Sequence, residues 1–387
     1  MSELIYLDNA ATTKVAPEVY EAMNPYFEEY YGNAASVYRF AGESKKAVED
    51  ARKEVADFLG AKPNEIYFTG GGSESDNWAL KGIAFSQRKK GKHIITSAIE
   101  HHAILHTCEY LEKLGYEITY VGVDENGIIK LDELEKSIRE DTILISVMFA
   151  NNEIGSIQPI KEIGEIAKKH KVLFHTDAVQ AYGHVPINVD ECHIDMLSAS
   201  GHKINGPKGI GFLYIRKGVK IRSFVHGGAQ ERKRRAGTEN VPGIAGLGVA
   251  AELFCKNRST YVEQMYACKK HLIEGLEVLE DVTVNGVSGL PLEETAPHIV
   301  SASFAGVRSE VLLHALAEKG VFVSSGSACS SNHPELSGTL KAIGVADELL
   351  DSTLRFSFST DTTIEQIDYA LEQLYNLLPM LRRFIRK

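Results

Sequence analysis

Short runs rich in β-branched and aromatic residues alternate with amphipathic stretches between residues 65 and 216 of the 387-residue chain. The runs predict strands at Ile66–Thr69, His93–Ser97, Glu117–Val123, Thr142–Phe149, Val172–Thr176, Asp195–Ala199 and Gly211–Ile215. Helical periodicity separates several of them, notably at Ser73–Arg88, His102–Leu114 and Pro159–His170. Strands that alternate with helices predict βαβ units and a mostly parallel sheet, in which ligands bind at the carboxyl ends of the strands.

The pattern changes in the last third of the chain. A long helical region runs from Val241 to Leu279, and its polar stretch predicts a break near Asn257–Ser259. Strands and helices then alternate again at His298–Phe304, Ser309–Lys319, Val321–Ser324, Ser337–Ile343, Leu354–Ser359 and Ile364–Leu381. This pattern predicts a second, smaller α/β domain, with the boundary near residue 260.

Composition and charge narrow the class of protein. Hydrophobic residues make up 44% and charged residues 24%, which is typical of soluble globular chains. The net charge of −10 argues against nucleic acid as the main ligand. No apolar run approaches the roughly 18 residues of a membrane-spanning helix. Residues 1–13 lack a basic segment and do not resemble a secretory signal, so we expect a cytoplasmic protein.

The five cysteines form an odd, widely spaced set without a C-x-x-C pair, so neither a disulfide framework nor a metal site is expected. Cys329 lies in a Ser/Gly-rich loop, Ser324 to Asn332, without apolar periodicity, which favours a reactive thiol. Three others, Cys108, Cys255 and Cys268, lie in helical stretches and are expected to be structural.

Several polar residues directly follow predicted strands. Three glycines, Gly70 to Gly72, precede Ser73 at the start of a helix, which suits an anion, although the spacing is neither a P-loop nor G-x-G-x-x-G. A tight turn with Ser73 as the helix N-cap fits the same residues. Taken singly, Asp177 fits a helix N-cap, Lys203 a solvated lysine, and Asn152 a turn.

Taken together, these residues suggest one cofactor. The glycine loop, His101, Asn152, Asp177 and Lys203 all fall at strand ends of one sheet. An anion nest, a carboxylate, a lysine amine and Gln180 match the needs of pyridoxal phosphate, because Lys203 can form a Schiff base while Asp177 keeps the pyridine nitrogen protonated. Arg355 stands alone in an apolar strand, so we expect a buried partner or a substrate carboxylate there.

The motifs resemble those of the class V aminotransferase group of pyridoxal-phosphate enzymes and, within it, the NifS/IscS-like cysteine desulfurases. The resemblance covers essentially the whole chain. It rests on these segments: 6–13 (YLDNAATT), 73–77 (SESDN), 100–101 (EH), 151–155 (NNEIG), 177–180 (DAVQ), 200–203 (SGHK), 235–238 (RAGT) and 324–329 (SSGSAC). Ala34 and Tyr38 depart from the residues most common in the family, but neither belongs to the expected site.

The resemblance implies an α/β fold of the pyridoxal-phosphate transferase type I. It implies a large cofactor-binding domain, residues 16–260, and a small domain, residues 1–15 and 261–387, that carries the catalytic-cysteine loop. Lys203 would bind the cofactor, Asp177 would pair with its ring nitrogen, Gln180 would contact its phenolic oxygen, and His101 would stack on the ring and transfer protons. The remaining implied cofactor contacts are Gly72, Ser73, Ser200, His202, Asn152 and, from the neighbouring subunit of a homodimer, Thr238.

The implied activity is conversion of L-cysteine to L-alanine with transfer of sulfur to Cys329 as a persulfide. Asn152 and Arg355 would hold the substrate carboxylate. The sulfur would supply iron–sulfur cluster assembly or the thiolation of tRNA or cofactors, through a scaffold protein or a tRNA-thiolation enzyme. Basic residues at 232–235 and 382–387 fit an acidic partner or, equally, a solvated face and a frayed terminus.

Other functions remain open from the sequence. A transaminase, a kynureninase-like enzyme or a selenocysteine lyase would share the cofactor site, although a transaminase has no need of Cys329. A catalytically inert pyridoxal-phosphate scaffold would not need Lys203, His101, Arg355 and Cys329 together. A redox-only thiol protein would not need Asp177 or Lys203.

Overall fold

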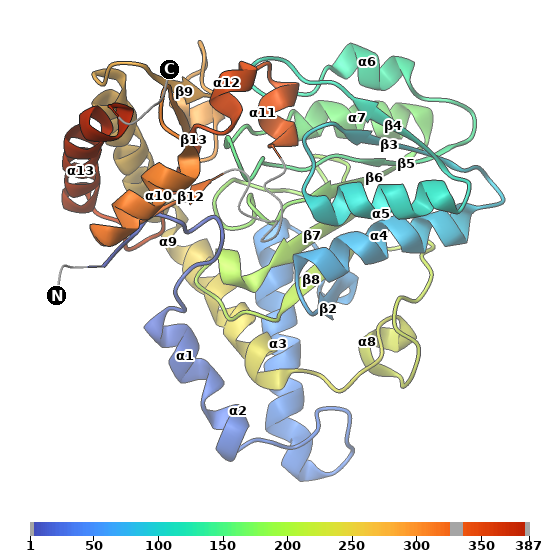
Figure 1. Ribbon diagram of the computed structural model, residues 1–387. Coiled ribbons are helices and arrows are strands. Elements are labelled where there is room, and N and C mark those ends of the chain that lie inside the picture. The colour runs from blue at the N-terminus through green and yellow to red at the C-terminus, as the bar shows by residue number, and fades with distance from the viewer. Residues whose placement is uncertain (1–3, 326–335, 384–387) are drawn as a thin grey trace.

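The computed structural model describes residues 4–325 and 336–383 and centres on a seven-stranded sheet (Figure 1). Its strands lie in the order β2-β8-β7-β6-β5-β3-β4. β8 alone runs opposite to the other six strands, which confirms the expected α/β fold with a mostly parallel sheet. The bounds are β2 Ile66–Thr69, β3 His93–Ser97, β4 Glu117–Val121, β5 Thr142–Ser146, β6 Leu173–Asp177, β7 Met196–Ser200 and β8 Gly211–Ile215.

Helices cover both faces of this sheet because its strands are apolar on both sides. In β8, Phe212 and Tyr214 face one core, whereas Leu213 and Ile215 face the other. Two helices, α4 (Gly72–Gln87) and α5 (His102–Lys113), pack on the second face. On the first face lie α3 (Gly42–Leu59), α7 (Ile160–His170) and the first half of α9 (Val241–Glu277).

The predicted break near Asn257–Ser259 is wrong, because α9 is one continuous helix of 37 residues. The polar stretch contains neither glycine nor proline, and Asn257 donates its side-chain amide to the carbonyl of Leu253 one turn earlier. The polar stretch lies where the helix leaves one hydrophobic core and enters another: Phe254 packs in the larger core and Met265 in the second. The polar residues are therefore a change of surroundings along one helix.

The second core belongs to a four-stranded antiparallel sheet in the order β12-β13-β10-β9. Ile5 and Leu7 from the N-terminal segment also pack into this core, and β1 pairs with β11. The two cores support the division into residues 16–260 and residues 1–15 with 261–387, which stays a prediction. The bounds are β1 Ile5–Tyr6, β9 Val282–Asn285, β10 Ile299–Phe304, β11 Val321–Phe322, β12 Ser324–Ser325, β13 Thr353–Ser357, α10 Ser309–Glu318 and α13 Ile364–Arg382.

Shorter helices complete the fold, and none of the described helices is long and apolar enough to cross a membrane. Helices α1 and α2 lie beside the start of α3, at the end of the molecule farthest from the four-stranded sheet (Figure 1). The bounds are α1 Pro17–Met23, α2 Pro25–Glu28, α6 Leu131–Lys136, α8 Gln230–Lys233, α11 Gly338–Ala342 and α12 Asp347–Leu350.

Candidate active site

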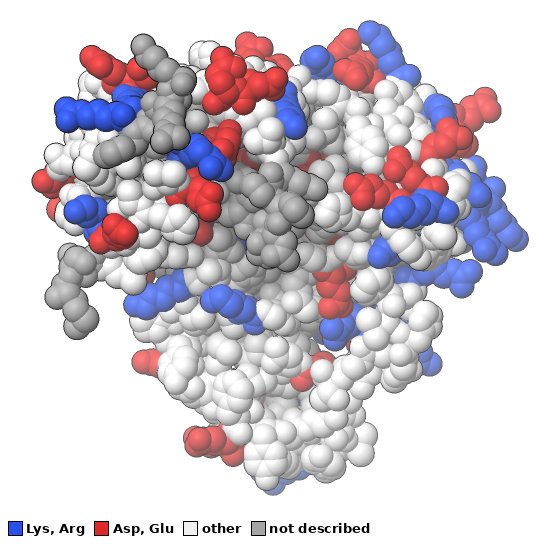
Figure 2. All heavy atoms as spheres, viewed as in Figure 1, with Lys and Arg blue, Asp and Glu red and all other residues white. Residues whose placement is uncertain are grey.

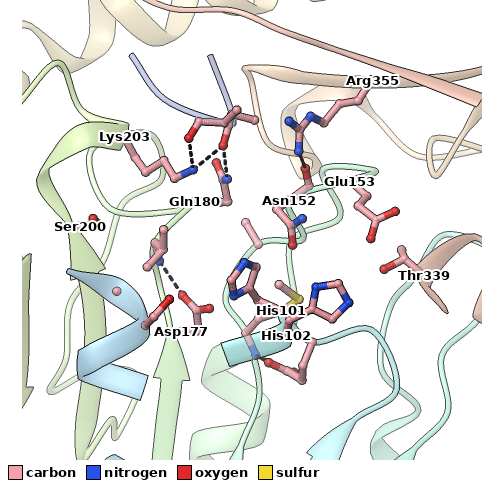
Figure 3. Close-up of a pocket in the computed structure, with 18 of the residues that line it drawn as sticks. His101, His102, Asn152, Glu153, Asp177, Gln180, Ser200, Lys203, Thr339 and Arg355 are labelled. Carbon is pink, nitrogen blue, oxygen red and sulfur yellow. Dashed lines mark hydrogen bonds between the residues drawn. The ribbon is translucent and has the colours of Figure 1, made fainter. Parts of the chain in front are cut away.

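A cavity of about 480 Å³ opens at the carboxyl ends of the parallel strands, between the two cores. The structure brings ten of the expected site residues together in its lining: Gly72, Ser73, His101, Asn152, Asp177, Gln180, Ser200, His202, Lys203 and Arg355. Figure 3 labels His101, Asn152, Asp177, Gln180, Ser200, Lys203 and Arg355 among them. Thr238 is exposed and lies outside this lining, beside Gly70 and Gly209. Cys329 lies outside the described residues.

The glycine loop leads from β2 into α4 with little spare room. Gly71 has φ 145°, in a region that favours glycine, and a Cβ on Gly72 would come within 2.6 Å of Val179 Cγ2. The helix N-cap is Gly71, so the alternative in which Ser73 caps the helix is wrong. The exposed Ser73 hydroxyl and the first-turn N–H groups border a hollow shared with Ser200, where the geometry suits an anion.

Lys203 follows β7 in a short 3-10 turn, Gly201–Lys203, and reaches across to the N-terminal segment. Its Nζ donates to the carbonyl oxygens of Ala10 at 2.5 Å and Ala11 at 2.9 Å. The Nδ1 atom of the neighbouring His202 lies 3.2 Å from Thr12 Oγ1, and these two atoms form a hydrogen bond. Residues 10–12 therefore form the wall against which the lysine amine is held.

Asp177 ends β6 and is 5% exposed. Its Oδ1 accepts the Val179 N–H at 2.9 Å. This hydrogen bond and the nearby Lys203 charge lower the pKa of Asp177, whereas burial raises it. Burial is the largest cause, and it raises the pKa of Asp177 to about 6. The carboxylate is charged at neutral pH and lies ready to pair with a cationic group in the cavity.

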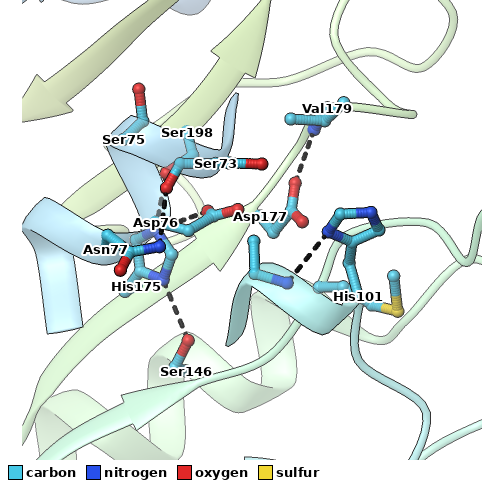
Figure 4. A network of polar contacts seen from close by, with 12 residues as sticks. Ser73, Ser75, Asp76, Asn77, His101, Ser146, His175, Asp177, Val179 and Ser198 are labelled. Carbon is cyan, nitrogen blue, oxygen red and sulfur yellow. Dashed lines mark hydrogen bonds and ion pairs between the residues drawn. The ribbon is translucent and has the colours of Figure 1, made fainter. Parts of the chain in front are cut away.

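Behind Asp177 lies a buried polar network that no sequence pattern predicted (Figure 4). His175 bonds Ser146 Oγ and Ser198 Oγ, each at 2.9 Å, and its Nε2 lies 3.8 Å from Asp76 Oδ1. Burial lowers the pKa of His175 to about 3 and, with the Asp177 charge, raises that of Asp76 well above its usual value. Because the His175 ring is neutral, this contact is no ion pair. Asp76 Oδ1 has no hydrogen-bond partner among the described residues, although Asp76 lines the cavity.

His101 is the N-cap of α5, and its Nδ1 accepts the Ala103 N–H at 3.1 Å. Burial and the nearby His102 lower its pKa to about 4, so the ring is neutral. Because Nδ1 accepts, the proton of the neutral ring is on Nε2. The preceding residue, Glu100, is buried and accepts a hydrogen bond from the Met148 N–H. Burial raises the pKa of Glu100 to about 8.

Gln180 lies one turn after Asp177 and is held on both sides. Its Nε2 donates to the Ala10 carbonyl at 3.0 Å, and its Oε1 lies 3.0 Å from His298 Nε2. His298 directly precedes β10 of the small sheet. No sequence pattern predicted a role for His298, since a lone histidine before a strand carries no signal of its own. We call Asp177, Gln180 and His101 the Asp177 end of the cavity.

The opposite end, here called the Arg355 end, consists of Arg355, Asn152 and Glu153. Arg355 donates to Asp8 Oδ1 and to the backbone carbonyl of Asn152, each at 2.8 Å. Its side chain is 12% exposed and its Nε has no partner among the described residues. The expected partner is Asp8, although its side chain is 20% exposed and so only partly buried. Glu153 accepts the Ser337 hydroxyl at 2.5 Å, and burial raises its pKa.

The remaining expectations concern cysteines and basic patches. Cys108 and Cys268 are buried as expected, whereas Cys255 is exposed on α9. In the 232–235 patch, Arg235 pairs with Glu74 at 2.8 Å, and Arg232 and Arg234 each lie 5.0 Å from the Tyr67 ring. This patch is therefore partly engaged within the chain. No group of three metal-binding side chains occurs within residues 4–325 and 336–383.

Comparisons with known proteins agree with this geometry. The model of the family "Aminotransferase class-V" matches residues 5–370. The chain is 54% identical to "Cysteine desulfurase IscS" of Methanosarcina thermophila, over 98% of this chain and 93% of that protein. It is 49% identical to the protein of the same name from Dictyoglomus turgidum, over 99% and 96%.

Solved structures give the same result. A "NIFS-LIKE PROTEIN" superposes with a TM-score of 0.92 at 40% identity, covering 98% of this chain and 100% of that one. "SspA in complex with cysteine" superposes with a TM-score of 0.81 at 36% identity, covering 92% and 99%. The fold is that of the NifS-like pyridoxal-phosphate enzymes, and the chain belongs to the class V aminotransferase family and, within it, to the cysteine desulfurases.

Proposed function

We propose that this protein is a pyridoxal-phosphate-dependent cysteine desulfurase that converts L-cysteine to L-alanine and passes the sulfur to Cys329. The observation that carries the proposal is one cavity with Lys203 and Asp177 on one side and Arg355 on the other (Figure 3). A cofactor that binds an amino group and a cation that binds a carboxylate are what a free amino acid requires.

The residues fit pyridoxal phosphate. The Gly72 backbone leaves no room for a side chain, the first turn of α4 suits a phosphate, and the charged Asp177 suits a protonated ring nitrogen. In this assignment Ser73, Ser200 and His202 contact the phosphate, Gln180 the phenolic oxygen, and His101 the ring face. When bound, the cofactor supplies an electron sink for the carbon next to the substrate amine.

The chain's own residues supply the rest of the chemistry. Lys203 would hold the cofactor covalently, and its amine would serve as the base that takes up the substrate Cα proton. The neutral His101 presents its Nε2 proton to the cavity for exchange with the reacting atoms. Arg355 and Asn152 hold the substrate carboxylate. The Cys329 thiolate would attack the substrate sulfur, so that the S–S bond forms while the C–S bond breaks. The electron pair of the C–S bond would stay with the three-carbon product, which takes up protons at Cβ and Cα and leaves as alanine.

The flanks of the Cys329 segment support this last step. Ser324 and Ser325 on one side and Gly338 and Thr339 on the other line the cavity. Cys329 is four residues beyond Ser325, and four residues span up to about 14 Å. On the near side, Ser324 pairs with Arg355 across β12 and β13, so the described chain before Cys329 ends beside the Arg355 end of the cavity.

A homodimer is part of the proposal. Large aromatic side chains from α1 to the start of α3 are exposed, and Figure 2 shows few charges on this part of the surface; they are Tyr20, Phe27, Tyr31, Tyr38 and Phe40. Such a patch is typical of an interface, and a second copy of the chain is the proposed occupant because Thr238 is exposed and lies outside the cavity lining of its own subunit. Sedimentation tests this: a species of twice 42.6 kDa is expected, and a monomer that still makes alanine would contradict it.

The sulfur acceptor is proposed to be an iron–sulfur scaffold protein or a tRNA-thiolation enzyme. The test is transfer of ³⁵S from labelled Cys329 to each candidate acceptor in a purified mixture. The Cys329→Ala variant is the matched control, because it retains the cofactor site but has no thiol to carry sulfur. Release of label only as free sulfide would contradict an acceptor of either class.

A further inference from the structure

The two sheets are joined at Gln180 by a hydrogen bond whose donor can be assigned. Gln180 follows β6 in the large sheet, and His298 precedes β10 in the small one, yet their side chains lie 3.0 Å apart. Both residues are at most 5% exposed, so water does not compete for this contact. An interaction so buried contributes more to orientation than an exposed one.

The chemistry of the partners fixes which atom donates. The Ala10 carbonyl is an acceptor only, so the Gln180 atom 3.0 Å from it is the amide nitrogen. The amide oxygen therefore points at His298, and His298 Nε2 must carry the proton. His298 Nδ1 has no hydrogen-bond partner among the described residues, as expected for the unprotonated nitrogen of a neutral ring.

The surroundings of His298 disfavour a charged ring. It stacks on the buried His184 ring with centroids 3.9 Å apart, and the planes differ by 20°. Burial, His184 and the buried Lys269 all lower the pKa of His298 well below its usual value. Two stacked cations would repel at this distance, whereas two neutral imidazoles pack as aromatic rings.

We propose that His298 is a positioning residue that locks the Gln180 amide with its nitrogen toward the cofactor site. One amide N–H is engaged by Ala10, and the second is left for the phenolic oxygen of pyridoxal phosphate, which rests on the function proposed above. Lys203 and Gln180 also share the Ala10 carbonyl as acceptor. The His298 contact thus links the four-stranded sheet to Gln180 and, through the Ala10 carbonyl, to Lys203.

The test is the absorption of bound pyridoxal phosphate as a function of pH in the holoenzyme. A donor at the phenolic oxygen stabilises its negative charge and weakens its hold on the neighbouring Schiff-base proton. His298→Phe keeps a ring stacked on His184 but removes the N–H that holds the Gln180 amide oxygen. The Gln180 amide is then no longer held as a donor to the phenolic oxygen, so the titration midpoint should rise by about one pH unit. His298→Gln restores an N–H near the Nε2 position and should return the midpoint toward that of the unsubstituted protein.

Two controls separate positioning from general damage. His184→Phe retains the stacked ring and the His298–Gln180 bond, so it should leave the midpoint unchanged. In a Gln180→Leu background, His298→Phe should add no further shift, since the two act through one contact. A shift that persists in that background, or an unchanged midpoint in His298→Phe alone, would overturn the proposal.

A second measurement does not depend on any variant's folding. In ¹⁵N-histidine-labelled holoenzyme, His298 should show a protonated Nε2 and a bare Nδ1 from pH 6 to pH 8. The opposite tautomer, or a ring that titrates in this range, would refute the assignment. Failure of the unsubstituted holoenzyme to make alanine from L-cysteine would instead reject the proposed function and leave the cofactor spectrum as an independent readout.

Discussion

At the Asp177 end of the cavity, each polar group is held by a contact that a bound ligand leaves in place. Val179 holds Asp177, His298 holds Gln180, and Ala103 holds His101. At the Arg355 end, the guanidinium is engaged by Asp8 and the Asn152 carbonyl, and a substrate carboxylate has to share or displace these partners. One end is therefore preorganised for a resident group and the other is built for exchange.

The largest expected effect comes from Lys203, which serves both ends. Lys203→Ala should lower alanine formation about 10⁴-fold or more, because the covalent link and the base are lost together. Mass spectrometry after borohydride reduction should show no cofactor attached to the variant chain. Near-normal turnover would show that another amine does this work.

Asp177→Asn tests the preorganised end. We expect turnover to fall about 10²- to 10³-fold, since the charge that stabilises the ring nitrogen is gone. We also expect the cofactor-free chain to become more stable at pH 7, by about 1 to 3 kcal/mol, because a buried charge is removed.

The pH dependence of this stability follows from the raised pKa. Because the pKa of Asp177 rises from 3.8 to about 6 on folding, the unsubstituted chain loses stability as pH increases through this window. The gain in Asp177→Asn should therefore be absent below about pH 3.8 and complete above about pH 6. Chemical denaturation at several pH values measures it, and a gain independent of pH would contradict the assignment.

Arg355→Lys tests the exchangeable end. Lysine keeps the charge but loses the planar pair of donors, so KM for L-cysteine should rise about 10- to 100-fold with a smaller change in kcat. Steady-state alanine formation separates the two constants. A fall in kcat at unchanged KM would place Arg355 outside substrate binding.

Asp8→Asn gives the smallest expected effect and the sharpest contrast between the two ends. If Asp8 competes with the substrate carboxylate for Arg355, neutralising it should lower KM for L-cysteine about 2- to 10-fold. Asp132→Asn removes a carboxylate that is exposed on α6 and should change nothing. A raised KM in Asp8→Asn would mean that Asp8 orients Arg355 and does not compete with the substrate.

The strand ends were the most predictable part of the site. Apolar runs located the strands, and the rule that ligands bind at their carboxyl ends brought Asp177, Lys203 and His101 into one expectation. The resemblance to a family then assigned their roles. The break expected in α9 was wrong because polarity along a helix reports its surroundings, and two successive cores produce the same pattern as a loop.

The supporting residues were not predictable in the same way. His298 and Asp76 owe their positions to tertiary packing: one arrives from the small sheet and the other lies inside α4. Neither has a local pattern that distinguishes it from a surface residue of the same type. Asp8 was likewise invisible as the partner of Arg355, since 347 positions separate the two in the chain.

The most direct test of the proposed function is mass spectrometry of the Cys329 peptide after the purified holoenzyme is incubated with L-cysteine without added thiol. Alanine is quantified in the same sample, and Cys329→Ala is the matched control. We predict one additional sulfur on Cys329 together with alanine, and neither product in quantity from the variant. Unmodified Cys329 in the absence of alanine would contradict the function proposed for this cavity.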